Sequence, residues 1–263
     1  MKLYGRGECE NVMAVKRETA LRYGAHLSLA DMKYTAGIIE KCGCGALQIF
    51  SDGARSNLEK LISVYDLEIS AHMPYVVNLA SGDESLREKS VEHVIAALDE
   101  SSRLKIKNYV VHPGSGTYDR LEESIDEIIK NTRGLYSRLL IENTEGSGNK
   151  LFAAEDEIAG FIGKYHGNIG ICWDTAHAFG AGVDTLSLSA DVLKHIKLVH
   201  LNDSKMPFGS KKDRHAGYSE GLIGLKAIEK MIEKMGSTPA YIIEREGYEN
   251  ICSDLLFLNG IRL

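Results

Sequence analysis

Short apolar runs alternate with longer amphipathic segments along most of the chain. The runs are rich in β-branched residues, as buried strands are, and the segments between them repeat apolar residues at helical spacing. Strands that alternate with helices indicate a parallel sheet, as an open doubly wound sheet or as a closed barrel, and eight clean units favour the α/β class of (β/α)₈ barrel, the TIM barrel. The expected strands are 21–26, 46–50, 67–72, 107–112, 138–142, 168–174, 196–201 and 239–244, and the expected helices are 31–42, 55–65, 84–104, 119–134, 153–165, 185–195, 223–235 and 250–259.

The chain length suits one large domain. A chain of 263 residues with four prolines and no low-complexity stretch contains no evident linker, so we expect residues 21–263 to form a single barrel domain. Residues 1–20 precede the first expected strand and are polar with mixed charge. This N-terminal extension has no assigned role, and a lid, a plug beneath the barrel and a disordered tail are all compatible with it.

The cysteines and the hydropathy pattern bear on the compartment. The five cysteines are odd in number and include no Cys-x-x-Cys pair, which predicts neither a disulfide framework nor a thiolate zinc site. A reducing, intracellular compartment fits this usage. The N-terminus lacks the apolar core of a signal peptide, and no apolar run approaches the roughly 18 residues of a membrane span. We therefore expect a cytoplasmic protein with no membrane partner.

Ionisable residues stand at the ends of most expected strands. In a barrel all strand carboxyl ends meet at one rim, where active sites lie. One such residue can be a satisfied buried polar group, but burying many of them without partners is costly, and metal coordination satisfies several at once. The sequence therefore predicts a metal site at the C-terminal rim. The strand-end residues are His26, Phe50, His72, His112, Glu142, Asp174, His200 (one residue before its strand ends) and Glu244.

The residue types and spacings narrow the kind of metal site. Imidazole with carboxylate and no thiolate suits zinc, manganese or iron. Glu142 precedes a Gly-containing polar loop, and a carboxylate there can bridge two metals. Asp174 could simply cap the next helix, but this leaves His177, three residues on, unexplained. Asp213 and His215 are spaced i, i+2, so in an extended loop both side chains can chelate one ion.

The charge balance bears on nucleic-acid binding. A formal net charge of −6 argues against a nucleic-acid binder taken as a whole, although bound divalent metals would offset it. Lys205, Lys211, Lys212 and Arg214 surround the Asp213–His215 pair. This loop is either a solvated charged loop or a phosphate-contacting surface, and the acidic cluster beside it favours the second. The charge pattern thus predicts a localised binding face.

Together these segments resemble the endonuclease IV family, a group of xylose-isomerase-like barrels. The Asp-Thr-x-His and His-Leu-Asn-Asp-Ser-Lys…Asp-Arg-His segments are highly specific. The matching pieces occur in the family's order: Gly24–Ser28, His72–Tyr75, His112–Gly114, Glu142–Thr144, Asp174–Phe179, His200–Lys205 and Asp213–His215.

The resemblance implies three Zn²⁺ ions per chain, with Mn²⁺ or Fe²⁺ as alternatives in one site. Glu142 would bridge two ions and position the attacking hydroxide. One ion would be held by His72, His112 and Glu142, the second by Glu142, Asp174, His200 and Glu244, and the third by His177, Asp213 and His215. His26 is a secondary candidate near the site.

The resemblance also implies an activity and a partner. Similar enzymes hydrolyse the phosphodiester 5′ to an abasic site in double-stranded DNA, leave a 3′-hydroxyl in base excision repair, and remove 3′-blocking groups. We expect a monomer that associates with the nucleoid when it is on DNA. Tyr75 would pack near the abasic sugar, Arg55 would enter or flank the duplex, and Lys205, Lys211 and Arg214 would contact phosphates.

Two segments depart from the family pattern. In the loop 51–57, only Arg55 and Asn57 resemble the Asn-, Gln- and Arg-rich loop of similar enzymes, and Arg245-Glu246 replaces the common Thr-Pro after Glu244.

Two alternative functions fit the residues less well. A sugar isomerase or epimerase on the same kind of barrel would leave the third ligand set without a role. A non-catalytic protein that binds damaged DNA or metal would be expected to have lost a ligand, and none is lost.

Overall fold

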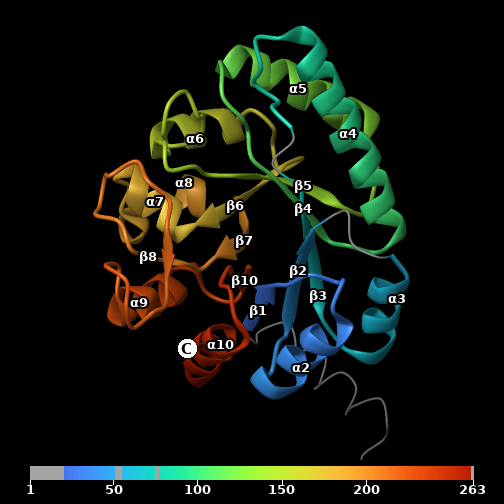
Figure 1. Ribbon diagram of the computed structural model, residues 1–263. Helices are drawn as coiled ribbons and strands as arrows, with labels where there is room; N and C mark the ends of the chain where they lie inside the picture. Colours follow the sequence, from blue (N-terminus) through green and yellow to red (C-terminus); the bar gives the residue numbers. More distant parts are fainter. Residues whose placement is uncertain (1–20, 51–54, 75–76, 262–263) are drawn as a thin grey trace, which may run out of the picture.

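The fold is a closed barrel of eight parallel strands, which confirms the predicted architecture (Figure 1). The computed structural model describes residues 21–50, 55–74 and 77–261. The strands follow the order β1-β10-β7-β6-β5-β4-β3-β2 around the barrel. They are β1 Arg22–His26, β2 Ala46–Phe50, β3 Glu68–His72, β4 Asn108–Val111, β5 Arg138–Glu142, β6 Gly170–Asp174, β7 Ile196–His200 and β10 Ala240–Ile243.

Side chains alternate between the barrel interior and the helical layer, as the pleat of a strand requires. Most of the buried apolar residues form one large cluster between the strands and the helices. A smaller apolar cluster, drawn from six strands, fills the interior. Two positions further along four of these strands stand Glu142, Asp174, His200 and Glu244, which therefore sit on an apolar floor. The floor residues are Ala46, Val110, Leu140, Cys172, Leu198, Ala240 and Ile242.

Helices alternate with the strands and surround the barrel (Figure 1). Several begin at side-chain caps: Asp83 and Thr117, for example, accept hydrogen bonds from the backbone at the start of α4 and α5. No described helix is both long and apolar enough to cross a membrane. The helices are α2 Met32–Cys42, α3 Arg55–Val64, α4 Glu84–Arg103, α5 Tyr118–Asn131, α6 Glu155–Gly163, α7 Thr175–Ala181, α8 Ala190–Leu193, α9 Leu225–Met235 and α10 Tyr248–Gly260, with the 3₁₀ helix η1 Thr185–Ser187 before α8.

Three regions differ from the elements expected from the sequence. Helix α7 follows β6 directly, because Asp174 ends the strand and its carboxylate accepts a hydrogen bond from the backbone N–H of His177 at 2.7 Å. The single helix expected over 185–195 is instead η1 and the short α8. After β7 the chain forms a small antiparallel pair, β8 Asp203–Ser204 with β9 His215–Ala216, which brackets the basic loop.

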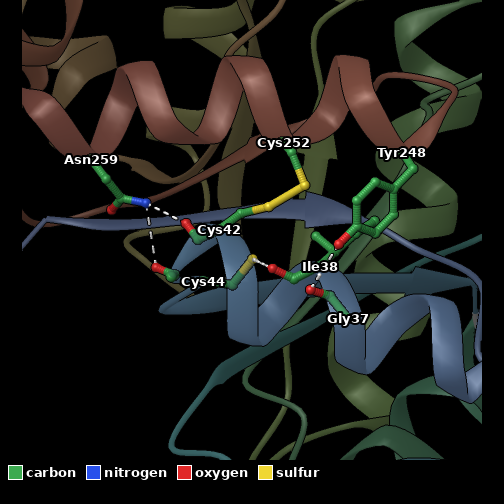
Figure 2. Close-up of a disulfide and its surroundings, with 8 residues drawn as sticks. Gly37, Ile38, Cys42, Cys44, Tyr248, Cys252 and Asn259 are labelled. Atoms are coloured by element: carbon green, nitrogen blue, oxygen red, sulfur yellow. Dashed lines mark hydrogen bonds between the residues drawn. A yellow bond between two sulfur atoms is a disulfide. The ribbon is translucent and has the colours of Figure 1, made fainter.

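A disulfide joins α2 to α10, so the expectation that the cysteines form no disulfide is wrong (Figure 2). Cys42 ends α2 and Cys252 lies in α10, with Cα atoms 5.5 Å apart and a sequence separation of 210. Figure 2 shows one of the α2–α10 hydrogen bonds on each side of this disulfide. Asn259 Nδ2 donates to the Cys42 carbonyl at 2.6 Å, and the Tyr248 hydroxyl donates to the Gly37 carbonyl at 3.3 Å. The first and last described helices are thus fastened together outside the β1–β10 seam.

We expect the disulfide to stabilise the folded chain. Cys252→Ser should lower the free energy of unfolding by about 2–4 kcal/mol, because the cross-link restricts a long loop of the unfolded chain. Urea unfolding with and without a thiol reductant measures this. Reductant should destabilise the parent protein and leave Cys252→Ser unchanged, and Cys44→Ser, which removes a nearby free thiol, should keep the parent's response. Equal midpoints for parent and Cys252→Ser without reductant would contradict the cross-link.

Candidate metal centre

A ring of ionisable side chains occupies the carboxyl ends of the strands. The structure brings all nine sequence-predicted ligands together there. Six of them lie at or one residue beyond strand ends, and the other three come from the following elements, His177 from α7, Asp213 from the loop and His215 from β9. The six are His72 of β3, His112 after β4, Glu142 of β5, Asp174 of β6, His200 of β7 and Glu244 after β10.

Glu142 is the centre of this ring. Its carboxylate is 1% exposed and contacts imidazoles from four other segments. Oε2 lies 2.9 Å from His72 Nε2 and 3.5 Å from His112 Nε2. Oε1 lies 3.0 Å from His200 Nδ1 and 3.3 Å from His177 Nδ1. One carboxylate with an oxygen facing each side is the geometry that a bridging ligand needs.

Asp174, His200 and Glu244 converge on the same side of Glu142. His200 Nδ1 lies 3.5 Å from Glu244 Oε2 and 3.9 Å from Asp174 Oδ2. Asn202 holds the two carboxylates, donating from Nδ2 to Asp174 Oδ2 at 2.7 Å and to Glu244 Oε2 at 3.2 Å. These contacts fix both acids with oxygens directed toward the imidazole.

Asp213 joins the two histidines beyond the strands. Its Oδ1 lies 3.1 Å from His215 Nε2, and its Oδ2 lies 3.4 Å from His177 Nε2. The opposite ring nitrogens face backbone carbonyls, His177 Nδ1 at 2.9 Å from Asn143 O and His215 Nδ1 at 3.2 Å from Glu244 O. Such contacts fix the tautomer and leave both Nε2 atoms for a ligand.

The donor atoms group as metal ligands do. In each of three sets of described residues, ligand atoms lie within 4.8 Å of one another. One set, Glu142 with Asp174, His200 and Glu244, is the second predicted ligand set in full; the others overlap the predicted sets, with His200 beside His72 and Glu142, and Asp174 beside His177 and His215. Nitrogen and carboxylate donors without thiolate suit zinc and similar transition ions, so the residues fit the implied metals.

Burial and mutual charge shift the pKa values of the central groups in opposite directions. Burial alone would raise the pKa of Glu142, but the imidazoles of His112 and His200 hold it well below its usual range. Burial lowers the pKa of His112 to about 4. Burial raises the pKa of Asp174. The centre therefore combines ionised and neutral groups at close range, as metal sites do.

Neighbouring acids raise the pKa values of three histidines of the ring. Burial opposes the charged form, yet Asp174 and the hydrogen bond to Asp213 hold the pKa of His177 well above its usual value. Against the same opposing effect of burial, the carboxylates of Glu244 and Glu142 hold the pKa of His200 well above its usual value. For His215, Asp213 and Asp174 outweigh burial and raise the pKa to about 9. Each imidazolium must lose the proton on its coordinating nitrogen before it can bind a metal.

Three amide side chains in the site were not predicted from the sequence. Asn143 follows Glu142 and pairs with the backbone of Asp174 in both directions, at 2.7 and 2.9 Å. Asn202 holds the carboxylates of Asp174 and Glu244. Gln48 lies inside the barrel, two positions before Phe50. Gln48 could have been predicted from the period-2 alternation of β2, because residues two apart on a strand lie on the same face and Phe50 stands at the strand end.

The basic residues predicted to contact DNA lie on the surface. Lys205, Lys211 and Arg214 are exposed on the loop between β8 and β9, and the Lys205 N–H donates to the Arg214 carbonyl at 2.9 Å. Arg55 is exposed at the start of α3 and forms ion pairs with Glu59 at 3.1 Å and with Glu100 at 3.2 Å. Tyr75 and residues 51–54 lie outside the described residues.

A pocket adjoins the ring on the side of β3 and β4. Its volume is about 210 Å³. His112 contributes to its wall, so the pocket opens beside the Glu142 cluster. Its walls mix apolar and polar groups, as small-molecule pockets do. They include Met73, Pro74, Val77, Asn78, Thr144 and Lys150.

Comparison with known proteins identifies relatives that all belong to one family. The family model described as "Xylose isomerase-like TIM barrel" matches residues 30–258. The probable endonuclease 4 of Halothermothrix orenii is 32% identical over 278 residues, covering 92% of this chain and 99% of that protein. Endonuclease 4 of Thermus thermophilus is 35% identical over 230 residues, covering 77% of this chain and 84% of that protein.

Solved structures give the same result. The crystal structure of endonuclease IV from Thermus thermophilus has a TM-score of 0.78 and 30% identity, and covers 90% of this chain and 99% of that one. A D-tagatose 3-epimerase-like protein has a TM-score of 0.77 at 21% identity, covering 91% of this chain and 96% of that one. The second likeness shows the shared fold alone.

Metal binding should release protons even above the pH at which ordinary histidines are neutral. The pKa of His215 is raised to about 9, and the pKa values of His177 and His200 are raised well above the usual value, so metal binding has to displace a proton from the coordinating nitrogen of these imidazoles. Affinity for Zn²⁺ should therefore keep rising between pH 7 and 8. Calorimetric titration in two buffers with different ionisation heats counts the released protons.

The control variants separate these protons from those of surface histidines. His215→Asn should release fewer protons at pH 8, whereas His93→Asn, exposed on α4, should match the parent. Zinc binding at pH 8 without proton release would contradict the raised pKa values.

Proposed function

The chain belongs to the endonuclease IV family of xylose isomerase-like TIM barrels, and from this premise we propose that it is a zinc-dependent abasic-site endonuclease. It hydrolyses the DNA phosphodiester 5′ to an abasic site, leaves a 3′-hydroxyl, and also removes 3′-blocking groups. The observation that carries the proposal is Glu142, a buried carboxylate with imidazoles on both oxygens and two further carboxylates nearby. Such a site is suited to holding several cations against a phosphate.

The proposed ligand sets divide the ring among three zinc ions. Glu142 would be shared between two of these ions. When bound, the ions would supply a water of lowered pKa and positive charge against the phosphate. His72 and His112 complete the first set with Glu142; Asp174, His200 and Glu244 complete the second; and His177, Asp213 and His215 form the third.

The chain's own residues hold these donors in place. The Met73 carbonyl contacts His72 Nδ1 at 2.8 Å, so that Nε2 faces Glu142. The Asn143 carbonyl does the same for His177, whose Nε2 faces Asp213. Imidazoles held in this way need little rearrangement to bind an ion, which favours a preorganised site.

We propose that the duplex lies across the rim with its backbone against the β8–β9 loop. Lys205, Lys211 and Arg214 would contact phosphates from there. Arg55 would contribute only by leaving its ion pairs with Glu59 and Glu100, which are exposed and therefore weak. Acting on DNA, the protein would work inside the cell as a monomer, associated with the nucleoid while bound.

A sugar epimerase is the second candidate, because a D-tagatose 3-epimerase-like protein shares the fold. The third ligand set speaks against it. A single metal site needs one set of ligands, and this chain gathers His177, Asp213 and His215 into a further set beside the first. We therefore retain the endonuclease as the proposed function.

Replacing Glu142 should abolish incision more than it weakens binding. Glu142→Gln keeps the shape but removes the charge and one good ligand oxygen, while the basic loop stays intact. The rate of incision at a single abasic site should fall by more than about 10³-fold, because charge stabilisation and nucleophile generation each contribute several kcal/mol. Single-turnover cleavage and equilibrium binding of the same duplex, at one salt concentration, measure the two effects.

Glu68→Gln is the matched control for this substitution. Glu68 is also a largely buried carboxylate, but it begins β3 at the opposite end of the barrel, where it pairs with Arg22 and Lys107. The Glu68→Gln variant should have a lower free energy of unfolding but the same cleavage rate per folded molecule as the parent. Wild-type cleavage by folded Glu142→Gln would falsify the bridging role.

The basic loop should contribute sequence-independent affinity. Lys211→Ala and Arg214→Ala should each weaken binding of abasic and intact duplex alike, and should reduce the slope of log affinity against log salt by about 1, because each removes one phosphate contact. Lys130→Ala is the control, since Lys130 lies in the last turn of α5, at the end that faces away from the rim. Unchanged slopes in both loop variants would place the duplex elsewhere.

A further inference from the structure

Gln48 is a buried polar residue in the barrel interior that none of the ligand sets includes. It lies in the middle of β2 with 0% of its surface exposed. The residue two positions before it, Ala46, belongs to the apolar floor. An amide at this depth needs hydrogen-bond partners at both its oxygen and its nitrogen.

The amide oxygen of Gln48 meets His200. His200 Nε2 lies 3.0 Å from Gln48 Oε1, and since an amide oxygen only accepts, the imidazole donates from Nε2. Strands β2 and β7 are not neighbours, because β1 and β10 lie between them in the barrel order. The contact therefore spans the interior. It leaves His200 Nδ1 as the nitrogen that faces Glu142 at 3.0 Å.

The amide nitrogen of Gln48 meets Glu244 and His26. Gln48 Nε2 donates to Glu244 Oε1 at 3.4 Å and lies 3.1 Å from His26 Nδ1. His26 Nδ1 itself lies 3.0 Å from Glu244 Oε1. A carboxylate only accepts, so His26 and Gln48 both donate to the same oxygen of Glu244. The other carboxylate oxygen of Glu244, Oε2, faces His200 Nδ1 at 3.5 Å.

We propose that Gln48, supported by His26, is a positioning residue of the metal centre. Its single amide sets the tautomer of His200 and the orientation of Glu244, two ligands of the second proposed ion. The inference rests on the proposed function and extends it to residues outside the ligand sets. An apolar side chain of similar size would fill the space beside the floor equally well. Both partners of the amide are proposed ligands, and this assigns Gln48 to the site rather than to the core.

A hydrogen bond that orients a metal ligand raises the affinity of the site for the metal. Losing one typically weakens metal binding by about 10–100-fold. Gln48→Leu removes both hydrogen bonds. The imidazole ring of His200 can then flip, whereas Glu244 is still held by His26 and Asn202. Gln48→Glu keeps an acceptor for His200 Nε2 and loses the donor to Glu244. The expected order of affinity is therefore parent, then Gln48→Glu, then Gln48→Leu.

The experiment is a titration of metal-stripped protein with Co²⁺, followed by visible absorption, with chelator competition to obtain the affinity of each site. Asn108→Leu is the matched control, since Asn108 is a buried amide at the start of β4, at the opposite end of the barrel. We expect Gln48→Leu to bind one Co²⁺ at least about 10-fold more weakly and with an altered spectrum. Asn108→Leu should bind as the parent does, whatever its loss of stability.

Each outcome decides the proposal. Parent-like cobalt affinity and spectrum in Gln48→Leu would overturn it, as would an equal loss in Asn108→Leu. If Gln48→Leu does not fold, Gln48→Glu decides: a shifted cobalt spectrum supports the proposal and an unchanged one overturns it. Failure of the proposed function looks different, because the parent protein would then bind no cobalt or would not cut abasic duplex.

Discussion

The burial of Glu142 among imidazoles is the constraint on which the rest of the site depends. A carboxylate that is 1% exposed needs compensating positive charge or hydrogen-bond donors, and here four imidazoles from separate segments supply them. Two further acids, Asp174 and Glu244, lie within 3.9 Å of the same His200 nitrogen. So dense a group of acids and bases at the end of an apolar interior is costly unless cations occupy it. We therefore expect metal binding to stabilise the folded chain.

The barrel makes this density attainable. Parallel strands in register put Asp174 opposite His200, and Phe50 opposite His72, although each pair is far apart in sequence. The apolar floor beneath keeps the ring at the mouth, where a phosphodiester can reach it. The disulfide between α2 and α10 fastens the helices outside the β1–β10 seam, and the contact of His26 with Glu244 crosses that same seam.

The sequence was sufficient for the eight strands, because short apolar runs between amphipathic segments are a local signal, and the nine residues that it proposes as ligands lie together at the rim. Helix α7 was missed because seven residues are too few to show a periodicity. Gln48 is not marked by the strand-end signal, because it lies two positions before the end of β2, and its place on the inner face follows only from the alternation along the strand. The Cys42–Cys252 pair spans 210 residues, so only the packing of α10 on α2 reveals it.

The number of metal ions bound per chain decides whether the ring around Glu142 is a three-metal centre. Protein purified with adequate zinc, then dialysed against a weak chelator, can be analysed for zinc, manganese and iron per folded chain, with His177→Ala beside it. We expect about three transition ions in the parent and about two in His177→Ala, because His177 belongs to the third proposed ligand set alone. One ion or none in the parent would contradict it, since the buried acids around Glu142 would then be stabilised by protons and histidines and not by a metal cluster.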